Sequence, residues 1–162
     1  MKKYAGIGSR ETPPEIIKQM TKIAEHFAVR NWILRSGGAD GADAAFEAGC
    51  DAMEGFKEIF LPWKGFNKSA SLYYQQPIEA FMLASQLHPV YKKLSYGAKK
   101  LHARNVQQIL GFELKDPVDL VICWTRNGKE VGGTATALKL ARQYKIRIIN
   151  LAVEPFDFAQ FS

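Results

Sequence analysis

Short apolar runs alternate with longer segments of helical periodicity along most of the chain. The run 118–124 is the clearest strand, because its near-continuous apolar character is typical of a central parallel strand. In 14–31, apolar residues recur every three or four positions, as in an amphipathic helix. The same reasoning predicts strands at 4–8, 32–34, 58–61, 118–124 and 146–151, and helices at 14–31, 44–55, 78–87, 98–110 and 134–144.

This order of elements predicts an α/β fold of the Rossmann-like, doubly wound type with a mostly parallel sheet, because helices separate successive strands. The 162 residues, of which 47% are hydrophobic, suffice for one core, so we expect a single domain over 1–162. The segment 64–111 is longer than a usual connection and is interpreted as a helical insertion over the sheet's edge or the site. The phenylalanines of the tail 152–162 are expected to dock on the body or on a second subunit.

A glycine pair, Gly37-Gly38, lies where a predicted strand leads into a predicted helix. Such a turn exposes amides at the positive end of the helix dipole, which suits a phosphate. Asp40 or Asp43 would cap the helix or accept a hydrogen bond from a sugar hydroxyl. The alternative is a tight turn with an aspartate cap. If the ligand approaches this backbone, Gly38→Val abolishes binding with little loss of fold.

A second turn of the same kind follows the strand 118–124, with Gly132-Gly133 before two threonines. A third polar turn, 9–12, follows the first strand. In an open parallel sheet the carboxyl ends of all strands lie on one side, so these turns are expected to converge on one crevice. The sequence therefore predicts a site there for a phosphate-bearing ligand, with two glycine pairs facing each other.

The net charge of +6 and the pI near 9.3 favour an anionic partner, although no run of five basic residues occurs. Lysines at 92, 93, 99 and 100 lie among the aromatic residues of the segment 64–111, a mixture that stacks bases and holds phosphates. Packing of these aromatics on the sheet explains them equally well. Trp63 and Trp124 are the candidates for contact with a base.

Other site types find little support. Cys50 and Cys123 have no CxxC spacing and no histidine neighbour, which argues against a metal site and a disulfide framework, so we expect neither metal nor cofactor. No apolar run approaches membrane-spanning length, and the N-terminus lacks a signal-peptide pattern. We therefore expect a cytoplasmic protein without a membrane partner. His102 is a weak site candidate, whereas His26 and His88 lack carboxylate neighbours.

The order of four motifs resembles the Rossmann-like domain of the DNA-processing protein DprA (Smf), a member of the SLOG superfamily. The motifs are Gly8-Ser9-Arg10 with Thr12, the stretch 36–43, Arg104-Asn105, and the stretch 132–137. The resemblance covers about residues 4–151. It implies a Rossmann-like fold, a pocket for nucleotide phosphates and a tendency to form homo-oligomers.

The same superfamily includes the LOG phosphoribohydrolases, from which this sequence departs at one important position. LOG enzymes carry PGGxGTxxE, whose glutamate is catalytic, and no carboxylate follows Gly132-Gly133 here. Breaking an N-glycosidic bond favours a nearby carboxylate, which leaves Glu11, Asp40, Asp43 and Glu130. The catalytic residues are therefore unassigned, and an enzymatic role is not favoured.

Three functions follow from these observations. The first is capture of a nucleotide or nucleotide-derived small molecule, for sensing or sequestration. The second is binding of single-stranded DNA along the lysines and Arg104, and the third is LOG-like hydrolysis of nucleoside monophosphates. The candidate ligand-binding residues are Gly8, Ser9, Arg10, Thr12, Ser36, Gly37, Gly38, Ala39, Asp40, Asp43, Trp63, Arg104, Asn105, Trp124, Thr125, Gly132, Gly133, Thr134 and Thr136.

Overall fold

The computed structural model describes all residues from 1 to 162 and contains one five-stranded parallel sheet in the order β3-β2-β1-β4-β5. Its strands are β1 (Lys3–Gly6), β2 (Ile33–Ser36), β3 (Lys57–Ile59), β4 (Leu120–Cys123) and β5 (Arg147–Asn150). Every neighbouring pair is parallel. The predicted Rossmann-like, doubly wound fold is confirmed.

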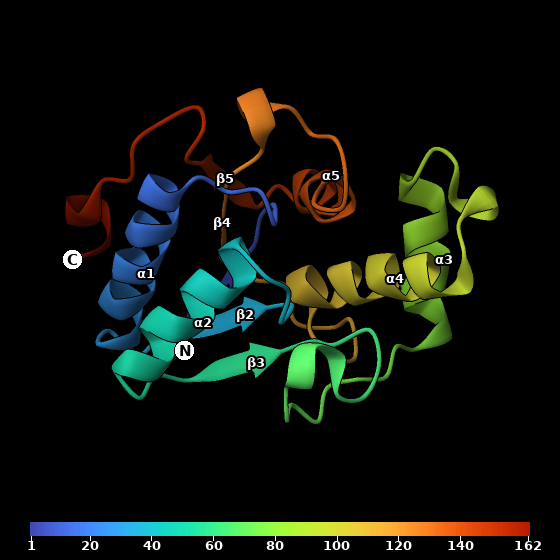
Figure 1. The fold of residues 1–162 in the computed structure, drawn as a ribbon, viewed down its shortest axis with the longest axis horizontal. Helices are drawn as coiled ribbons and strands as arrows, with labels where there is room; N and C mark the ends of the chain where they lie inside the picture. The colour runs from blue at the N-terminus through green and yellow to red at the C-terminus, as the bar shows by residue number, and fades with distance from the viewer.

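Helices cover both faces of this sheet (Figure 1). On one face α1 (Pro14–Ala28) packs against α2 (Ala42–Ala52), and their buried side chains join one apolar cluster. On the other face α4 (Tyr96–Leu110) and α5 (Ala135–Gln143) form a second cluster together with α3 (Ile78–Leu87). Four short 3-10 turns lie in the connections: η1 (Phe66–Lys68), η2 (Tyr91–Lys93), η3 (Arg126–Gly128) and η4 (Phe158–Phe161).

The direction of winding changes between β1 and β4. After β1 the chain moves outward through β2 to β3, and it then returns to the other side of β1 to form β4 and β5. Loops that leave β1 and β4 therefore diverge to opposite faces. A crevice outside the carboxyl ends of these two strands follows from that divergence.

The segment 64–111 contains the helix that returns the chain to β4. The second half of α4 is buried, and Val106 and Ile109 are fully enclosed in the core. By contrast, α3 packs on α4 and α5, and Figure 1 places it at the end of the molecule farthest from α1. The segment thus combines a core crossover helix with an outlying helical lobe.

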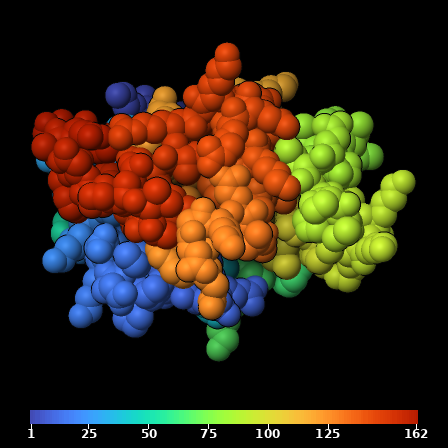
Figure 2. All heavy atoms as spheres, turned by 90° about the horizontal axis from the view of Figure 1, so that it is seen from above, coloured from blue at the N-terminus to red at the C-terminus, as the bar shows by residue number.

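The C-terminal tail folds back onto α1, as one of the two sequence alternatives predicts. The rings of Phe156 and Phe161 lie 5.9 and 5.3 Å from that of Phe27, centroid to centroid. His26 Nε2 also lies 2.9 Å from the carbonyl oxygen of Phe161. Figure 2 shows these last residues spread over one end of the molecule, opposite the lobe around α3.

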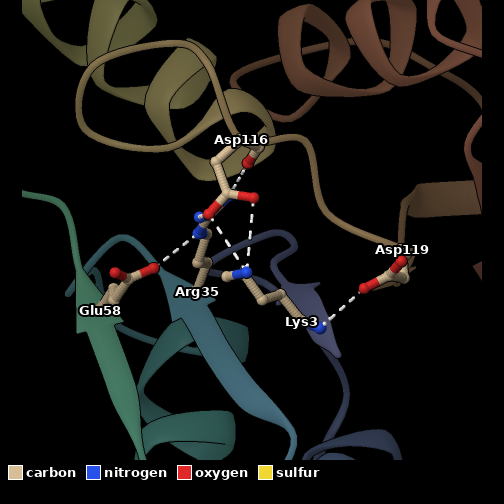
Figure 3. A network of polar contacts seen from close by, with 5 residues as sticks. All are labelled: Lys3, Arg35, Glu58, Asp116 and Asp119. Atoms are coloured by element: carbon tan, nitrogen blue, oxygen red, sulfur yellow. Dashed lines mark hydrogen bonds and ion pairs between the residues drawn. The ribbon is translucent and has the colours of Figure 1, made fainter. Parts of the chain in front are cut away.

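Arg35, in β2 two residues before the glycine pair Gly37-Gly38, has a structural role. Its buried guanidinium lies 2.7 Å from Glu58 and 2.8 Å from Asp116, and Lys3 also contacts Asp116 (Figure 3). Partial burial raises the pKa of Asp116, but the contacts with Lys3 and Arg35 outweigh it, so that the pKa is lowered overall. The network fixes β2, β3 and the loop before β4 relative to one another.

No helix of the structure combines the length and the apolarity that crossing a membrane requires. Cys50 and Cys123 are both buried and unpaired. No three of the His, Cys, Asp and Glu side chains lie close enough together to hold a metal ion.

Candidate functional site

A cavity of about 520 Å³ lies at the carboxyl ends of β1 and β4, at the reversal of the sheet. Its volume falls in the range of small-molecule sites. Four segments build it: the turn after β1, the turn between β2 and α2, the loop between β4 and α5, and one face of α4. The cavity therefore lies where the parallel-sheet argument places the crevice.

The turn after β1 forms one wall. Gly8 passes close to α2 and β4, since a Cβ there would lie 2.8 Å from Ala42 Cβ and 3.2 Å from the Trp124 carbonyl oxygen. Thr12 closes the turn, because its hydroxyl donates to the Ser9 carbonyl at 2.6 Å. Arg10 is exposed and forms no ion pair, whereas Glu11 pairs with Arg126 across the mouth.

The loop between β4 and α5 forms the opposite wall. Thr125 is fixed by Asn150, whose side-chain nitrogen donates to the Thr125 hydroxyl at 2.7 Å. The amides of Gly133 and Thr134 make no hydrogen bond to any other backbone group. They precede the first turn of α5, where the helix dipole is positive. This wall therefore presents free donors to an anion.

One face of α4 forms the third wall with side chains at positions 101, 104, 105 and 108. The spacing is that of a single helical stripe. Arg104, Asn105 and Gln108 are all buried, and they replace the apolar side chains that normally occupy such a stripe. Asn105 donates to the Gly133 carbonyl at 2.6 Å, which links α4 to the opposite loop.

Arg104 and Asp43 lie together at the cavity floor, and each is only 5% exposed. Arg104 donates through Nη1 to the carbonyls of Gly37 and Phe60 and through Nε to Asn105, while Nη2 has no partner. Burial lowers the pKa of Arg104 to about 10, an effect that Asp43 opposes and Arg10 reinforces. Burial raises the pKa of Asp43 to about 6 against the charge of Arg104. Both groups are thus predominantly charged above pH 7.

The first glycine turn differs from its expected role. Asp43 accepts a hydrogen bond from the Ala39 amide at 3.2 Å, and the Gly37 amide also stabilises its charged form. The carboxylate of the protein itself therefore fills the anion position of this turn. Gly38 has a φ of +69°, and a Cβ there would lie 2.8 Å from Leu61 Cδ2. This geometry argues against the expectation that Gly38→Val spares the fold, because the left-handed backbone and the contact with Leu61 both disfavour a side chain there.

The predicted residues divide into two groups. Those that line the cavity are Gly8, Ser9, Arg10, Ala39, Asp43, Arg104, Asn105, Thr125, Gly132, Gly133 and Thr134. The others do not line it and are Thr12, Ser36, Gly37, Gly38, Asp40, Trp63, Trp124 and Thr136.

Most residues of the second group have structural partners. The Ser36 hydroxyl donates to the Gly6 carbonyl at 2.7 Å. Asp40 lies at the surface, 3.4 Å from Asn67 Nδ2. Trp63 packs edge-on against Phe66, outside the cavity, so neither tryptophan provides a stacking surface there.

The sequence analysis missed several lining residues: Ile7, Leu101, Gln108, Arg126 and Val131. Gln108 was the most predictable of these, because it follows Arg104 by one helical turn. Arg126 and Val131 belong to an irregular loop, for which no periodic signal exists. Their positions depend on how that loop folds over the cavity.

His102 is the one histidine on the cavity wall. Its Nδ1 lies 2.9 Å from the Thr136 hydroxyl, and its ring is 4.6 Å from that of His88. Burial lowers the pKa of His102 to about 4, and the nearby charges of His88 and Arg104 act in the same direction. The imidazole is therefore neutral at physiological pH and adds no positive charge.

The four carboxylates considered for hydrolysis are also separated. Glu130 contacts Arg142 through both guanidinium nitrogens Nε and Nη2, and it does not line the cavity. Asp40 faces Asn67, and Glu11 lies at the mouth with Arg126. Only Asp43 lies at the cavity floor.

The raised pKa of Asp43 predicts a stability change with pH. Because the folded pKa exceeds that of the unfolded chain, the protein loses up to about 3 kcal/mol of stability as pH rises from 4 through 6. Asp43→Asn removes the titrating carboxyl and therefore this loss. The variant should raise the melting temperature, relative to the unmodified protein, by more at pH 7.5 than at pH 4. Thermal unfolding at both pH values measures the difference. Asp40→Asn, at the surface of the same turn, should change the melting temperature equally at both pH values. The same pH dependence in both variants would contradict the prediction.

Comparisons with known proteins identify a fold relationship. No protein-family model and no curated protein matches the sequence. DNA processing protein A from Helicobacter pylori, studied for its single-stranded DNA binding mode, is similar over 92% of this chain, with 17% identity and a TM-score of 0.60. DprA from Streptococcus pneumoniae is similar over 93%, with 17% identity and a TM-score of 0.55. This chain covers 64% and 50% of those two proteins, so the similarity is to part of each. The chain therefore has a DprA-like fold.

Proposed function

We propose that the protein binds a nucleotide or nucleotide-derived small molecule in the cavity at the reversal of the sheet, as a DprA-like domain of the SLOG type. One observation carries the proposal: hydrogen-bond donors without partners, from three separate segments, line a single cavity. They comprise the Arg10 guanidinium, Nη2 of Arg104, and the amides of Gly133 and Thr134. Arg104 is the buried member of this set, and a buried donor without a partner is unfavourable unless a ligand or water satisfies it.

The donors favour a phosphate near the mouth of the cavity. Arg10 forms no ion pair, and its guanidinium is a planar set of donors suited to phosphate oxygens. The free amides before α5 add a second set of donors at a helix N-terminus. Because Asp43 places a negative charge at the floor, the ligand's anionic group would lie with Arg10 and the Gly132-Gly133 turn.

The remainder of the ligand would contact a wall without Phe, Tyr or Trp side chains. The hydrophobic lining residues are Ile7, Ala39, Leu101 and Val131. A base would therefore pack against aliphatic groups, and shape and hydrogen bonds would determine its identity. Binding of this kind serves sensing or sequestration. Self-association, which the family resemblance implies, stays a prediction that sedimentation velocity measures.

Binding of single-stranded DNA is the second candidate. The H. pylori neighbour was studied for that activity, and the lobe around α3 and η2 carries lysines on aromatic rings. Lys99 lies 5.3 Å from the Tyr91 ring centroid and Lys100 lies 4.8 Å from that of Tyr96. Arg104, however, is buried at the cavity floor and cannot extend this surface.

Replacement of Arg10 by alanine tests the primary proposal. We expect about tenfold weaker binding of nucleoside monophosphates, since a charged hydrogen bond to phosphate contributes about 1.5–3 kcal/mol. Isothermal titration calorimetry measures the affinity. Lys18→Ala removes the same charge from the exposed surface of α1 and should leave the affinity unchanged.

Titration with oligodeoxynucleotides of increasing length, at two salt concentrations, separates the two candidates. Affinity that grows with length and falls steeply with salt favours DNA binding, because each neutralised phosphate releases counterions. Equal effects of Arg10→Ala and Lys18→Ala, or no binding of any mononucleotide, would contradict the primary proposal.

A further inference from the structure

Gln108 is a buried polar side chain without a partner. It is 3% exposed, lines the cavity, and makes no hydrogen bond within the protein through its side chain. Its neighbour Gln107 is also buried and points away from the cavity: Gln107 Nε2 donates to the carbonyls of Gln75 and Phe112 at 2.8 and 3.2 Å, and its Oε1 has no partner. An amide carries donors and acceptors whose burial is unfavourable when they are unsatisfied. Gln108 therefore points to a ligand group that both accepts and donates hydrogen bonds.

Asp43 lies beside this amide. A Cβ placed on Gly37 would be 2.3 Å from Gln108 Nε2 and 2.8 Å from Asp43 Oδ2, so the two side chains flank the same point. A carboxylate accepts about four hydrogen bonds; the Ala39 amide provides one of them at 3.2 Å, and the Gly37 amide and the Ser36 side chain also stabilise the charge of Asp43. The carboxylate thus retains acceptor positions for a ligand, next to an amide that both donates and accepts.

The chemistry of this floor suits neighbouring hydroxyl groups. A hydroxyl donates to the Asp43 carboxylate and accepts from the Gln108 amide at the same time, and an adjacent hydroxyl uses a second carboxylate position. At the floor the negative charge of Asp43 offsets the positive charge of Arg104, so a phosphate gains less there than beside Arg10. A base would find hydrogen bonds there, but no Phe, Tyr or Trp lines the cavity to stack on its face, and the ring of His102 already contacts Thr136 and His88.

We infer that the floor formed by Asp43 and Gln108 recognises the 2′,3′-diol of a ribose, so that the ligand is a ribonucleotide. The inference rests on the proposed function and extends it, because it names the sugar that the same cavity selects. The phosphate then lies near Arg10 and the Gly132-Gly133 turn, and the sugar lies over α4. A 2′-deoxyribose lacks one of the two hydroxyls and leaves a buried hydrogen-bonding group without a partner.

Paired titrations of the unmodified protein test this inference. AMP, GMP, CMP and UMP are each compared with the corresponding 2′-deoxynucleotide by isothermal titration calorimetry. For every pair that binds, we expect about tenfold weaker binding of the deoxy form, because an unsatisfied buried group is unfavourable by about 1–3 kcal/mol. Equal affinities within each pair would overturn the inference and leave the proposed function standing. Selectivity for one base without selectivity for the sugar would likewise overturn the inference and leave the proposed function standing.

Variants then locate the recognition. Asp43→Asn and Gln108→Leu should each reduce the preference for ribose severalfold, whereas Lys18→Ala should preserve it. Thermal unfolding identifies any variant that has lost its fold, and the measurement on the unmodified protein decides the question without them. A preference for ribose that persists in both folded variants would show that other residues recognise the sugar. Absence of binding by all eight nucleotides would overturn the inference together with the proposed function.

Discussion

Replacement of Arg104 by leucine is expected to lower the free energy of unfolding by about 3–5 kcal/mol, the usual effect of removing one partner from a buried set of charges. The carbonyls of Gly37 and Phe60 and the side chain of Asn105 would each lose a donor. Asp43 would be left at the floor without the positive charge that opposes its burial. Urea unfolding at pH 7.5 measures the change.

The double variant provides the internal control. Because part of the loss comes from an uncompensated carboxylate, Asp43→Asn should restore some of the stability of Arg104→Leu. A double-mutant cycle isolates that coupling. Arg126→Leu removes an arginine whose ion pair with Glu11 is largely exposed, and it should change stability by less than about 1 kcal/mol. Strictly additive effects of Arg104→Leu and Asp43→Asn would contradict the proposed electrostatic relationship.

Gly38→Val is expected to lower the free energy of unfolding by about 2–5 kcal/mol. The left-handed backbone at a φ of +69° disfavours any side chain by about 1–2 kcal/mol. Contact with Leu61 adds overpacking of the core, at about 1–3 kcal/mol. Thermal or urea unfolding measures the sum.

Gly133→Val is the matched control, since a Cβ at Gly133 meets no atom within 4 Å and its φ lies outside the left-handed region. It should change stability by less than about 1 kcal/mol. Because Gly133 lines the cavity, this variant is the one expected to weaken nucleotide binding. Equal stability of the two variants would contradict the different roles of the two glycine pairs.

Much of the fold was predictable because its signals are local. The order of strands and helices, the apolar run of β4 and the amphipathic α1 follow from hydrophobic spacing. That order, with the carboxyl-end rule for parallel sheets, also predicts where the crevice lies. The predicted bounds of α3 match those observed. The strands β1, β3, β4 and β5 end earlier than predicted, where the chain leaves the sheet for a turn, whereas β2 continues two residues further, to Ser36.

The details of the site were less predictable because they depend on which side chain fills which space. Both glycine pairs look alike in the sequence, yet Asp43 occupies the first turn and only the second presents free amides. Trp63 is of a residue type that stacks on bases, but it packs on Phe66 outside the cavity. From the sequence, the polar stripe on α4 would be assigned to a solvent-facing surface. In the structure the crossover places this stripe beneath the loop after β4.

By itself the sequence determined the doubly wound, mostly parallel sheet and the convergence of the first and last polar turns on one edge. Local periodicity and the rules of parallel-strand connection are sufficient for that. Only the tertiary structure decided that Arg104, Asp43 and Gln108 meet at the cavity floor. Their approach depends on packing between residues more than sixty positions apart. The burial that shifts the pKa values of Arg104 and Asp43, and that leaves Gln108 without a partner, exists only once that packing has formed.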